Sequence, residues 1–313
     1  MNIITLDDIY STFPVWLWKP YIPFGKVTII QGDPGDGKTT LILHIAAALS
    51  RGEVLHMDIK CKPSNIIYLN AEDGYADTIK PRLEAANADC RYIHTIDETD
   101  SALTMTDERI EAAIRLLDAK MLIIDPMQAY LGADVDMHRA NEIRPVMSRL
   151  AVIAENTGCA IVIIGHMNKA QGMKASYRGL GSIDFTAAAR SVLVVARDKS
   201  NPNLRVMAQI KNSLAPEGKP IAFEICGEEG VKLLGEYVCD IDDMLMGIGT
   251  DCDFNEAVGI IKQFLSEGEK PQREVMEKIS HLDIPSNKIK KIKAHLNIKS
   301  IKKGEHWYWC LML

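Results

Sequence analysis

One short stretch, GDPGDGKTT at residues 32–40, constrains the fold of this chain more than any other feature. It has the spacing G-x-x-x-x-G-K-T, it follows an apolar run at residues 26–31, and it precedes an apolar helical pattern that stops at Gly52. Glycines in such a loop let backbone N–H groups surround phosphate oxygens, and the helix N-terminus adds its dipole. The expected phosphate loop consists of Gly32, Asp33, Pro34, Gly35, Asp36, Gly37, Lys38, Thr39 and Thr40.

The same motif predicts ATP and Mg²⁺ as cofactors. Lys38 is expected to reach the β and γ phosphates, and the Thr39 hydroxyl to hold Mg²⁺. A later apolar run, MLII, ends at Asp125. We expect the carboxylate of Asp125 to bind the same ion directly or from just outside its ligand shell. Many ATPases place a glutamate beside this aspartate to activate water, but here Pro126 follows.

The catalytic base must therefore come from elsewhere. Ligands of parallel α/β sheets bind outside the carboxyl ends of the strands. Before Asp125, the strand pattern that ends in acids is IIYLNAED, which offers Glu72 and Asp73. Glu72 reaches one bond further and is the preferred candidate for polarising water, with Asp73 as the alternative.

Strand and helix patterns alternate through the first half of the chain, which predicts βαβ units and an α/β fold with a mostly parallel central sheet. A helical pattern at residues 106–119 is expected to begin with Thr106 as its N-cap. After residue 166 the pattern changes to a long polar loop and then to closely spaced, antiparallel strands. The predicted strand segments are 26–31, 65–74, 91–97, 121–125, 159–166, 191–198, 204–213 and 221–226.

Charge divides the chain unevenly. Residues 254–313 hold 11 Lys and Arg against 7 Asp and Glu, net +4, whereas the remainder holds 25 against 35, net −10. Such asymmetry indicates a basic module on an acidic body. We expect an ATPase domain at residues 1–239, a linker at 240–253 and a C-terminal domain at 254–313.

Composition excludes several other classes of protein. With 47% hydrophobic and 25% charged residues the chain has ordinary globular composition, and no apolar run approaches the roughly 18 residues that span a bilayer. The start, MNIITLDDIY, lacks the features of a signal peptide. Seven scattered cysteines fit reduced thiols. The sequence predicts a cytoplasmic protein without a membrane partner.

Four features resemble those of RecA-like ATPases. They are the phosphate loop, a Glu after the next strand, the aspartate without an adjacent glutamate, and GH at a later strand end. Across residues 10–228 the chain is most similar to the RepA-type hexameric helicases and their phage and prophage relatives. The resemblance implies that Glu72 activates water, that His166 senses the γ-phosphate and that Arg190 enters a neighbouring subunit's site. Other candidates for contact with the neighbour are Arg178, Arg205 and Lys211.

The resemblance also implies partners. The polar loop 167–184 corresponds to a segment that lines a central channel and touches single-stranded DNA, and Lys169, Lys174, Tyr177 and Arg178 are its candidate contacts. Residues 286–313 resemble a winged-helix module, with seven lysines and no acid between residues 287 and 304. Such a module binds duplex DNA or a partner protein.

These features together predict a RecA-like helicase or helicase-like ATPase that works as a homo-oligomer, with a hexamer favoured. The alternative is a regulatory DNA-binding protein in which ATP switches the oligomeric state without unwinding. A small-molecule P-loop kinase is a second rival, but the sequence shows neither an acceptor pocket nor an Arg-rich lid.

Overall fold

The computed structural model describes residues 3–311 apart from residues 56, 133–134, 138, 168–182, 199–200, 228–229, 240, 247–251, 283 and 305. The chain divides into two compact units, Met1–Tyr237 and Val238–Leu313, and each is described by itself. None of the helices in the described part of the chain is long and apolar enough to span a membrane.

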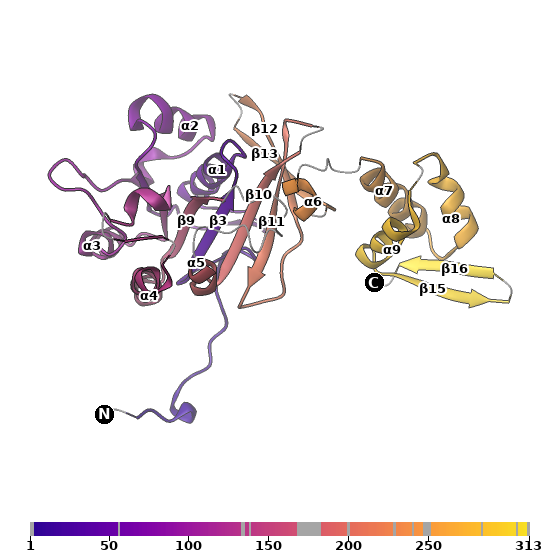
Figure 1. Ribbon diagram of the computed structural model, residues 1–313, viewed down its shortest axis with the longest axis horizontal. Helices are drawn as coiled ribbons and strands as arrows, with labels where there is room; N and C mark the ends of the chain where they lie inside the picture. Colours follow the sequence, from indigo (N-terminus) through magenta and orange to yellow (C-terminus); the bar gives the residue numbers. More distant parts are fainter. Residues whose placement is uncertain are drawn as a thin grey trace. The chain divides into compact units, whose positions relative to one another are not determined.

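The first unit is built around a nine-stranded sheet with the order β13-β12-β11-β10-β3-β9-β8-β6-β7 (Figure 1). Neighbouring strands from β10 to β7 pair in parallel, and those from β10 to β13 pair antiparallel. The predicted α/β fold with a mostly parallel sheet is thus confirmed. The strands are β3 Val27–Gly32, β6 Ile66–Asn70, β7 Ile93–His94, β8 Met121–Asp125, β9 Ala160–His166, β10 Ser191–Arg197, β11 Leu204–Asn212, β12 Ile221–Ile225 and β13 Val231–Glu236.

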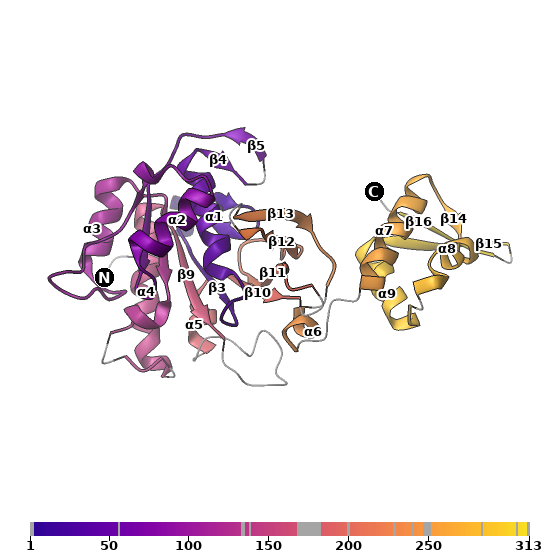
Figure 2. The same ribbon diagram turned by 90° about the horizontal axis from the view of Figure 1, so that it is seen from above.

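Helices cover both faces of this sheet, with α1 and α2 on one side and α3, α4 and α5 on the other (Figures 1 and 2). Alternate residues of each central strand enter opposite cores: Ile29 and Ile67 join one, and Ile30 and Ile66 the other. Burial on both faces explains why these strands read as continuous apolar runs. The helices are α1 Lys38–Ser50, α2 Lys80–Ala85, α3 Glu108–Leu117, α4 Ala140–Thr157 and α5 Ile183–Ala188.

Several local expectations were wrong. The strand expected at residues 91–97 is only Ile93–His94, preceded by a 3₁₀ turn at Cys90–Tyr92. The sequence pattern also missed the edge strand β13 and three short additions: the pair β1 (Trp16–Trp18) and β2 (Ile22–Pro23), the pair β4 (Glu53–Val54) and β5 (Met57–Lys60), and a π-helical turn, Tyr75–Ile79.

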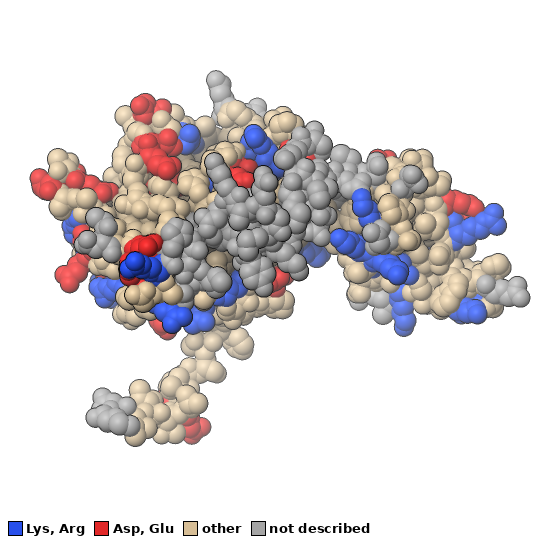
Figure 3. All heavy atoms as spheres, in the orientation of Figure 1, with Lys and Arg blue, Asp and Glu red and all other residues tan. Residues whose placement is uncertain are grey.

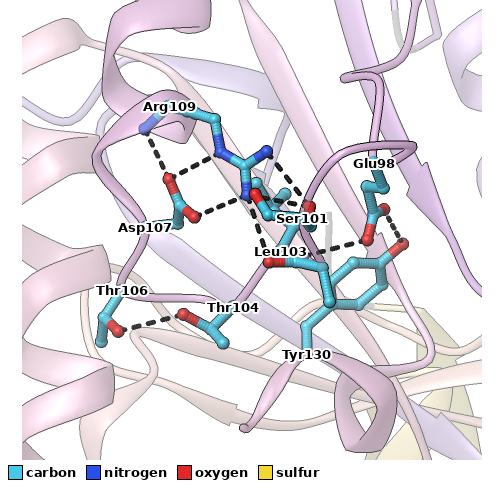
Figure 4. A network of polar contacts seen from close by, with 9 residues as sticks. Glu98, Ser101, Leu103, Thr104, Thr106, Asp107, Arg109 and Tyr130 are labelled. Atoms are coloured by element: carbon cyan, nitrogen blue, oxygen red, sulfur yellow. Dashed lines mark hydrogen bonds and ion pairs between the residues drawn. The ribbon is translucent and has the colours of Figure 1, made fainter.

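The N-cap of α3 is Asp107, not Thr106, because the Asp107 carboxylate accepts hydrogen bonds from the backbone N–H and guanidinium of Arg109. Figure 4 shows this cap within a polar network in which Arg109 also donates to carbonyls of the preceding loop. In the same network Glu98 accepts from the Tyr130 hydroxyl and the Leu103 N–H. The network fastens the loop between β7 and α3 to the turn after β8.

In the second unit, α7, α8 and α9 pack against an antiparallel sheet of order β14-β16-β15. Its core contains Trp309, which is almost fully buried, together with Ile261, Val275 and Ile292. The segment 240–253, expected to be a linker, contains α6 and the start of α7. The elements are α6 Ile241–Met246, α7 Cys252–Ser266, β14 Lys270–Pro271, α8 Gln272–Lys278, α9 Ser286–His295, β15 Ile298–Lys303 and β16 His306–Leu311.

Candidate functional site

The phosphate loop joins the carboxyl end of β3 to the first turn of α1. Gly37 precedes the helix with φ +90°, a left-handed conformation that favours glycine. The Lys38 side chain turns back over the loop, where Nζ donates to the carbonyl oxygens of Gly32 at 2.9 Å and Asp33 at 2.8 Å. Burial lowers the pKa of Lys38, and carboxylates that include Asp36 and Asp125 oppose this shift. The loop therefore holds a buried amine at the position expected for phosphate binding.

Two residues give this loop its shape. Asp36 accepts a 2.9 Å hydrogen bond from the Asp33 N–H, which closes the turn, and burial raises the pKa of its carboxyl to about 6. Gly32 lies tightly against the neighbouring strand, because a Cβ at this position would stand 2.3 Å from the Val195 carbonyl oxygen. The first glycine of the loop thus allows β3 and β10 to approach each other.

The structure brings Thr39 and Asp125 together. The Thr39 hydroxyl donates to Asp125 Oδ2 at 2.7 Å, and the Tyr68 hydroxyl donates to the same oxygen at 3.0 Å. Asp125 is buried, and burial raises the pKa of its carboxyl while the two hydroxyl donors lower it. Mg²⁺ in nucleotide sites is held by one or two carboxylates or hydroxyls together with phosphates and water. A hydroxyl and a carboxylate oxygen side by side at the phosphate loop fit this ion.

Glu72 lies on a turn that Asn70 shapes. Asn70 ends β6, level with Asp125 on β8, and its Oδ1 accepts hydrogen bonds from the N–H groups of Glu72 and Asp73. Its amide in turn donates to the Asp73 carbonyl. The two acids then diverge, because Asp73 pairs with Arg82 at 2.7 Å whereas Glu72 Oε1 lies 3.8 Å from His166 Nε2. Of the two candidate bases, Glu72 faces the phosphate-loop side of the sheet.

His166 ends β9, directly beside Gly32 at the end of β3. Its Nε2 faces Glu72, and its Nδ1 is buried without a hydrogen-bond partner within the described residues. The backbone N–H of Met167 donates to the Gly32 carbonyl at 3.3 Å. The chain that leaves β9 is thus attached to the phosphate loop at its first residue.

Arg190 lies at the amino end of the parallel strands, whereas the phosphate loop lies at their carboxyl end. Its N–H donates to the Val27 carbonyl, which places it level with the first residue of β3, roughly 17 Å of strand away from Gly32. Lys211 is near it and donates to the carbonyls of Thr186 and Ala187 at the end of α5. Burial and then the charge of Arg190 lower the pKa of Lys211. Neither cation can reach the phosphate loop of its own chain.

Two further arginines, which sequence reasoning did not place at this site, stand beside the phosphate loop. Arg197 and Arg205 are directly opposite each other on β10 and β11. Arg205 rests on Gly37, since a Cβ there would meet its Cδ at 3.0 Å and its Nε at 3.1 Å. Burial and Arg197 lower the pKa of Arg205, and Asp36 opposes this shift. Arg205, a candidate for contact with a neighbour, thus lies beside the phosphate loop of its own chain.

The expected nucleic-acid contacts Lys169, Lys174, Tyr177 and Arg178 lie outside the described residues. Asn70, Tyr68, Arg197 and Arg205 are the additions that the structure makes to the site. For Asn70, the only sequence signal was a polar residue at the end of β6. The pairing of Arg197 with Arg205 depends on the register of β10 and β11, which the spacing of residues in the sequence does not reveal.

A parallel sheet with a phosphate loop after β3 and the Thr39–Asp125 pair beside it define a RecA-like P-loop ATPase. The chain belongs to the AAA domain family, whose model matches residues 11–172, just over half of its length. These matched residues include the phosphate loop, Glu72, Asp125 and His166.

Relatives and solved structures agree with this class. The chain is similar to DNA repair protein RadA from Bacillus subtilis, with 25% identity over 209 residues, 66% of this chain and 40% of the relative. RadA from Halalkalibacterium halodurans is 27% identical over 203 residues, 64% of this chain and 39% of the relative. The chain thus matches about 40% of these relatives' length. A KaiC-like protein from Pyrococcus horikoshii shares the fold, with a TM-score of 0.51, 18% identity and coverage of 68% of this chain and 91% of that one.

Proposed function

We propose that this protein is an ATP-driven nucleic-acid motor, a replicative helicase or helicase-like ATPase of the RepA type. The observation that carries the proposal is the position of His166, between Glu72 on one side and the segment that follows β9 on the other. A side chain that contacts both the catalytic turn and the root of the next loop can transmit the state of the nucleotide to that loop. The RadA relatives, which are named DNA repair proteins, support a role on DNA.

The proposed chemistry assigns one task to each side chain. Lys38 exchanges its two carbonyl contacts for the β and γ phosphates of ATP. Thr39 and Asp125 hold Mg²⁺, which neutralises charge on the phosphates when it is bound. Glu72 polarises the attacking water, and the Asn70 bonds fix the backbone that carries it. His166 donates from Nε2 to Glu72 or to the γ-phosphate.

Arg190 is the proposed residue for transition-state charge in a neighbouring protomer. It lies at the amino end of the parallel strands, and its own phosphate loop lies at their carboxyl end, so a catalytic role requires a second copy. An arginine supplied in this way contributes roughly 10³–10⁵ in rate. The proposal therefore includes assembly into an oligomer, with a hexameric ring favoured.

Two regions are proposed to contact nucleic acid. The first is the loop with Lys169, Lys174, Tyr177 and Arg178, which directly follows His166 and Met167 and would bind single-stranded DNA. The second is the C-terminal unit, proposed to be a winged-helix-like module. There Lys290, Lys299 and Lys302 are exposed, and Trp307, also exposed, pairs with Lys302 across the hairpin of β15 and β16. Lysines mainly contact phosphate, so this unit would bind duplex DNA with little sequence selectivity.

The C-terminal unit also favours a second candidate function, an ATP-switched DNA-binding protein that assembles on DNA without unwinding it. Both candidates need the same nucleotide site, and they differ in what hydrolysis drives. A partner protein in place of duplex DNA would suit the same basic surface.

Steady-state ATPase assays with and without single-stranded DNA, beside a forked-duplex unwinding assay, test the proposal. We expect stimulation by single-stranded DNA and unwinding that requires hydrolysis. We expect His166→Ala to retain ATP binding but to lose the stimulation, whereas His94→Ala, remote from the phosphate loop, keeps it. Stimulation without unwinding would favour the switch, and ATPase activity indifferent to DNA would overturn the motor.

A further inference from the structure

Tyr75 directly follows the Glu72 turn, residues 71–74, and begins the π-helical turn that leads into α2. The residue is 40% exposed, yet its hydroxyl makes polar contacts at the end of β6. Tyr75 Oη accepts a 3.2 Å hydrogen bond from the Asn70 N–H, and the Tyr68 carbonyl oxygen lies 3.3 Å from the same atom. The hydroxyl is thus attached to the last part of the strand that carries Glu72.

These contacts lie on an edge of β6 that β7 leaves open. β7 is only two residues long and pairs with β6 no further than Ile67, whereas β6 continues to Asn70. Backbone groups of successive strand residues face opposite neighbours. The N–H of Ala71 donates to the Asp125 carbonyl on β8, so the N–H of Asn70 faces the other edge, beyond the end of β7. The Tyr75 hydroxyl therefore takes the place of a backbone partner that β7 does not supply.

Thr95, the first residue after β7, completes this link. Its Oγ1 lies 2.8 Å from Tyr75 Oη. Each hydroxyl has one proton and two acceptor lone pairs, so Thr95 can donate to Tyr75 while Tyr75 donates to the Tyr68 carbonyl. Side-chain hydrogen bonds thus join the end of β6 to the segment after β7, where the backbone pairing stops.

The link bears on Glu72 through Asn70. Asn70 Oδ1 accepts the N–H groups of Glu72 and Asp73, so the position of Asn70 sets the backbone of both acids. Figure 3 shows acidic side chains gathered on the surface around α2. Glu72, Asp73 and Asp77 lie within six residues, and like charges so close together repel one another. A turn with this charge needs an anchor, and Tyr75 supplies an uncharged one.

The ring of Tyr75 stands between two cavities. One, of about 390 Å³, lies toward Ile79 and Leu83 on the side of α2, and the other, of about 450 Å³, lies toward Asp97 and Glu98. Open space on both sides means that packing constrains the ring less than it constrains a core residue. The position of the ring therefore depends on the hydrogen bonds of its hydroxyl.

We propose that Tyr75 is a positioning residue for ATP hydrolysis, whose hydroxyl fixes the end of β6 and thereby holds Glu72 against the attacking water. The inference rests on the proposed role of Glu72 as the base. A displacement of about 1 Å can lower the rate roughly 10²-fold. Binding of ATP depends instead on the phosphate loop, where Lys38 and Thr39 have other partners.

Tyr75→Phe tests this role, because it removes one oxygen and keeps the ring. In the full-length protein with ATP and Mg²⁺, we expect kcat to fall roughly ten- to hundredfold while KM and nucleotide affinity stay unchanged. In a Glu72→Gln background, single-turnover assays should show no further fall, because both residues act on the same step. Tyr21→Phe is the matched control. It removes a hydroxyl that donates to the Lys219 carbonyl, near the amino end of the sheet, and should keep kcat.

Thr95 gives a second, independent pair of variants. Thr95→Val removes the hydroxyl that contacts Tyr75 and should also lower kcat, whereas Thr95→Ser keeps a hydroxyl and should retain the rate. Wild-type kcat in Tyr75→Phe and Thr95→Val would overturn the positioning role alone. A fall in kcat of the same factor with and without Glu72, or one accompanied by weaker ATP binding, would also overturn it. Full activity in Glu72→Gln would instead overturn the proposed base.

Discussion

The hydroxyl of Thr39 donates a 2.7 Å hydrogen bond to Oδ2 of Asp125, although 86 residues separate the two in the chain. The sheet order explains the contact, because only β9 lies between β3, which leads into the phosphate loop, and β8, which ends at Asp125. Because parallel strands have their carboxyl ends on the same side of the sheet, the two oxygens meet at the end of the phosphate loop.

Replacing Asp125 by Asn should abolish the dependence of ATP binding on Mg²⁺, because the amide lacks the charge that holds the ion. Titration calorimetry with and without Mg²⁺ measures this. Tyr68→Phe is the matched control, since it removes the other bond to Oδ2 and leaves the carboxylate. That variant should lose about 1 kcal/mol of stability and keep the Mg²⁺ effect. An Asp125→Asn protein that still binds ATP more tightly with Mg²⁺ would contradict the assignment.

Glu72→Gln should lower kcat for ATP hydrolysis by roughly 10²–10⁴ while ATP still binds, because glutamine cannot accept the proton of the attacking water. Asp73→Asn is the comparison. Asp73 is paired with Arg82, so its loss should cost local stability and little rate. Single-turnover ATPase assays beside nucleotide-binding assays separate the two effects. If Asp73→Asn lost more rate than Glu72→Gln, the base would be Asp73.

Arg190→Ala and Glu72→Gln should restore each other's activity when mixed. Each variant alone is expected to be nearly inactive, yet a mixed oligomer has interfaces in which one copy supplies Glu72 and its neighbour supplies Arg190. ATPase activity measured across mixing ratios should rise above that of both pure variants and peak near equal amounts. Activity that only averages the two would place the missing arginine elsewhere.

Arg205→Gln should weaken the binding of both ATP and ADP by roughly 10- to 100-fold, the range expected for a charge-assisted contact. The reason is its position on Gly37, where its half-buried guanidinium stands beside the phosphate loop of the same chain. Arg197→Gln, on the facing strand and exposed, should have a smaller effect. Fluorescent-nucleotide titrations measure both, and unchanged affinity in Arg205→Gln would assign this arginine to packing.

Asp36→Asn should stabilise the nucleotide-free protein at neutral pH. The pKa of the Asp36 carboxyl is raised from 3.8 to about 6, so the folded state binds more protons than the unfolded state between these values. The stability of the wild type therefore falls as the pH rises through this window, and the variant lacks this loss. The difference in Tm between the two proteins should be largest above about pH 6 and smallest below about pH 4. A difference independent of pH would show that the carboxyl is not perturbed.

The central strands and the phosphate loop could be predicted because burial on both faces and a glycine-rich turn leave local marks in the sequence. The strand that carries Asp125 is an example, since four buried apolar residues precede the acid. The pairing of Arg197 with Arg205 leaves no such mark, because it depends on the register of β10 and β11 and on a bulge between Val192 and Leu193. The sequence offered Glu72 and Asp73 as neighbours, but it does not show that Asp73 turns toward Arg82 and Glu72 toward His166. Thr106 failed as a cap for a similar reason, since the next residue, Asp107, makes the bond.

Gly32 shows how a residue of a ligand-binding motif can belong to the architecture instead. A methyl group at this position would overlap the Val195 carbonyl, so alanine there would push β10 away from β3. If Gly32→Ala then failed to bind nucleotide, the cause would be the displacement of β10 from β3 and not the loss of a contact with phosphate. Any survey of tolerated substitutions would group this glycine with the interior of the protein, while Gly35, with open space around it, would be constrained by its φ of +81° instead.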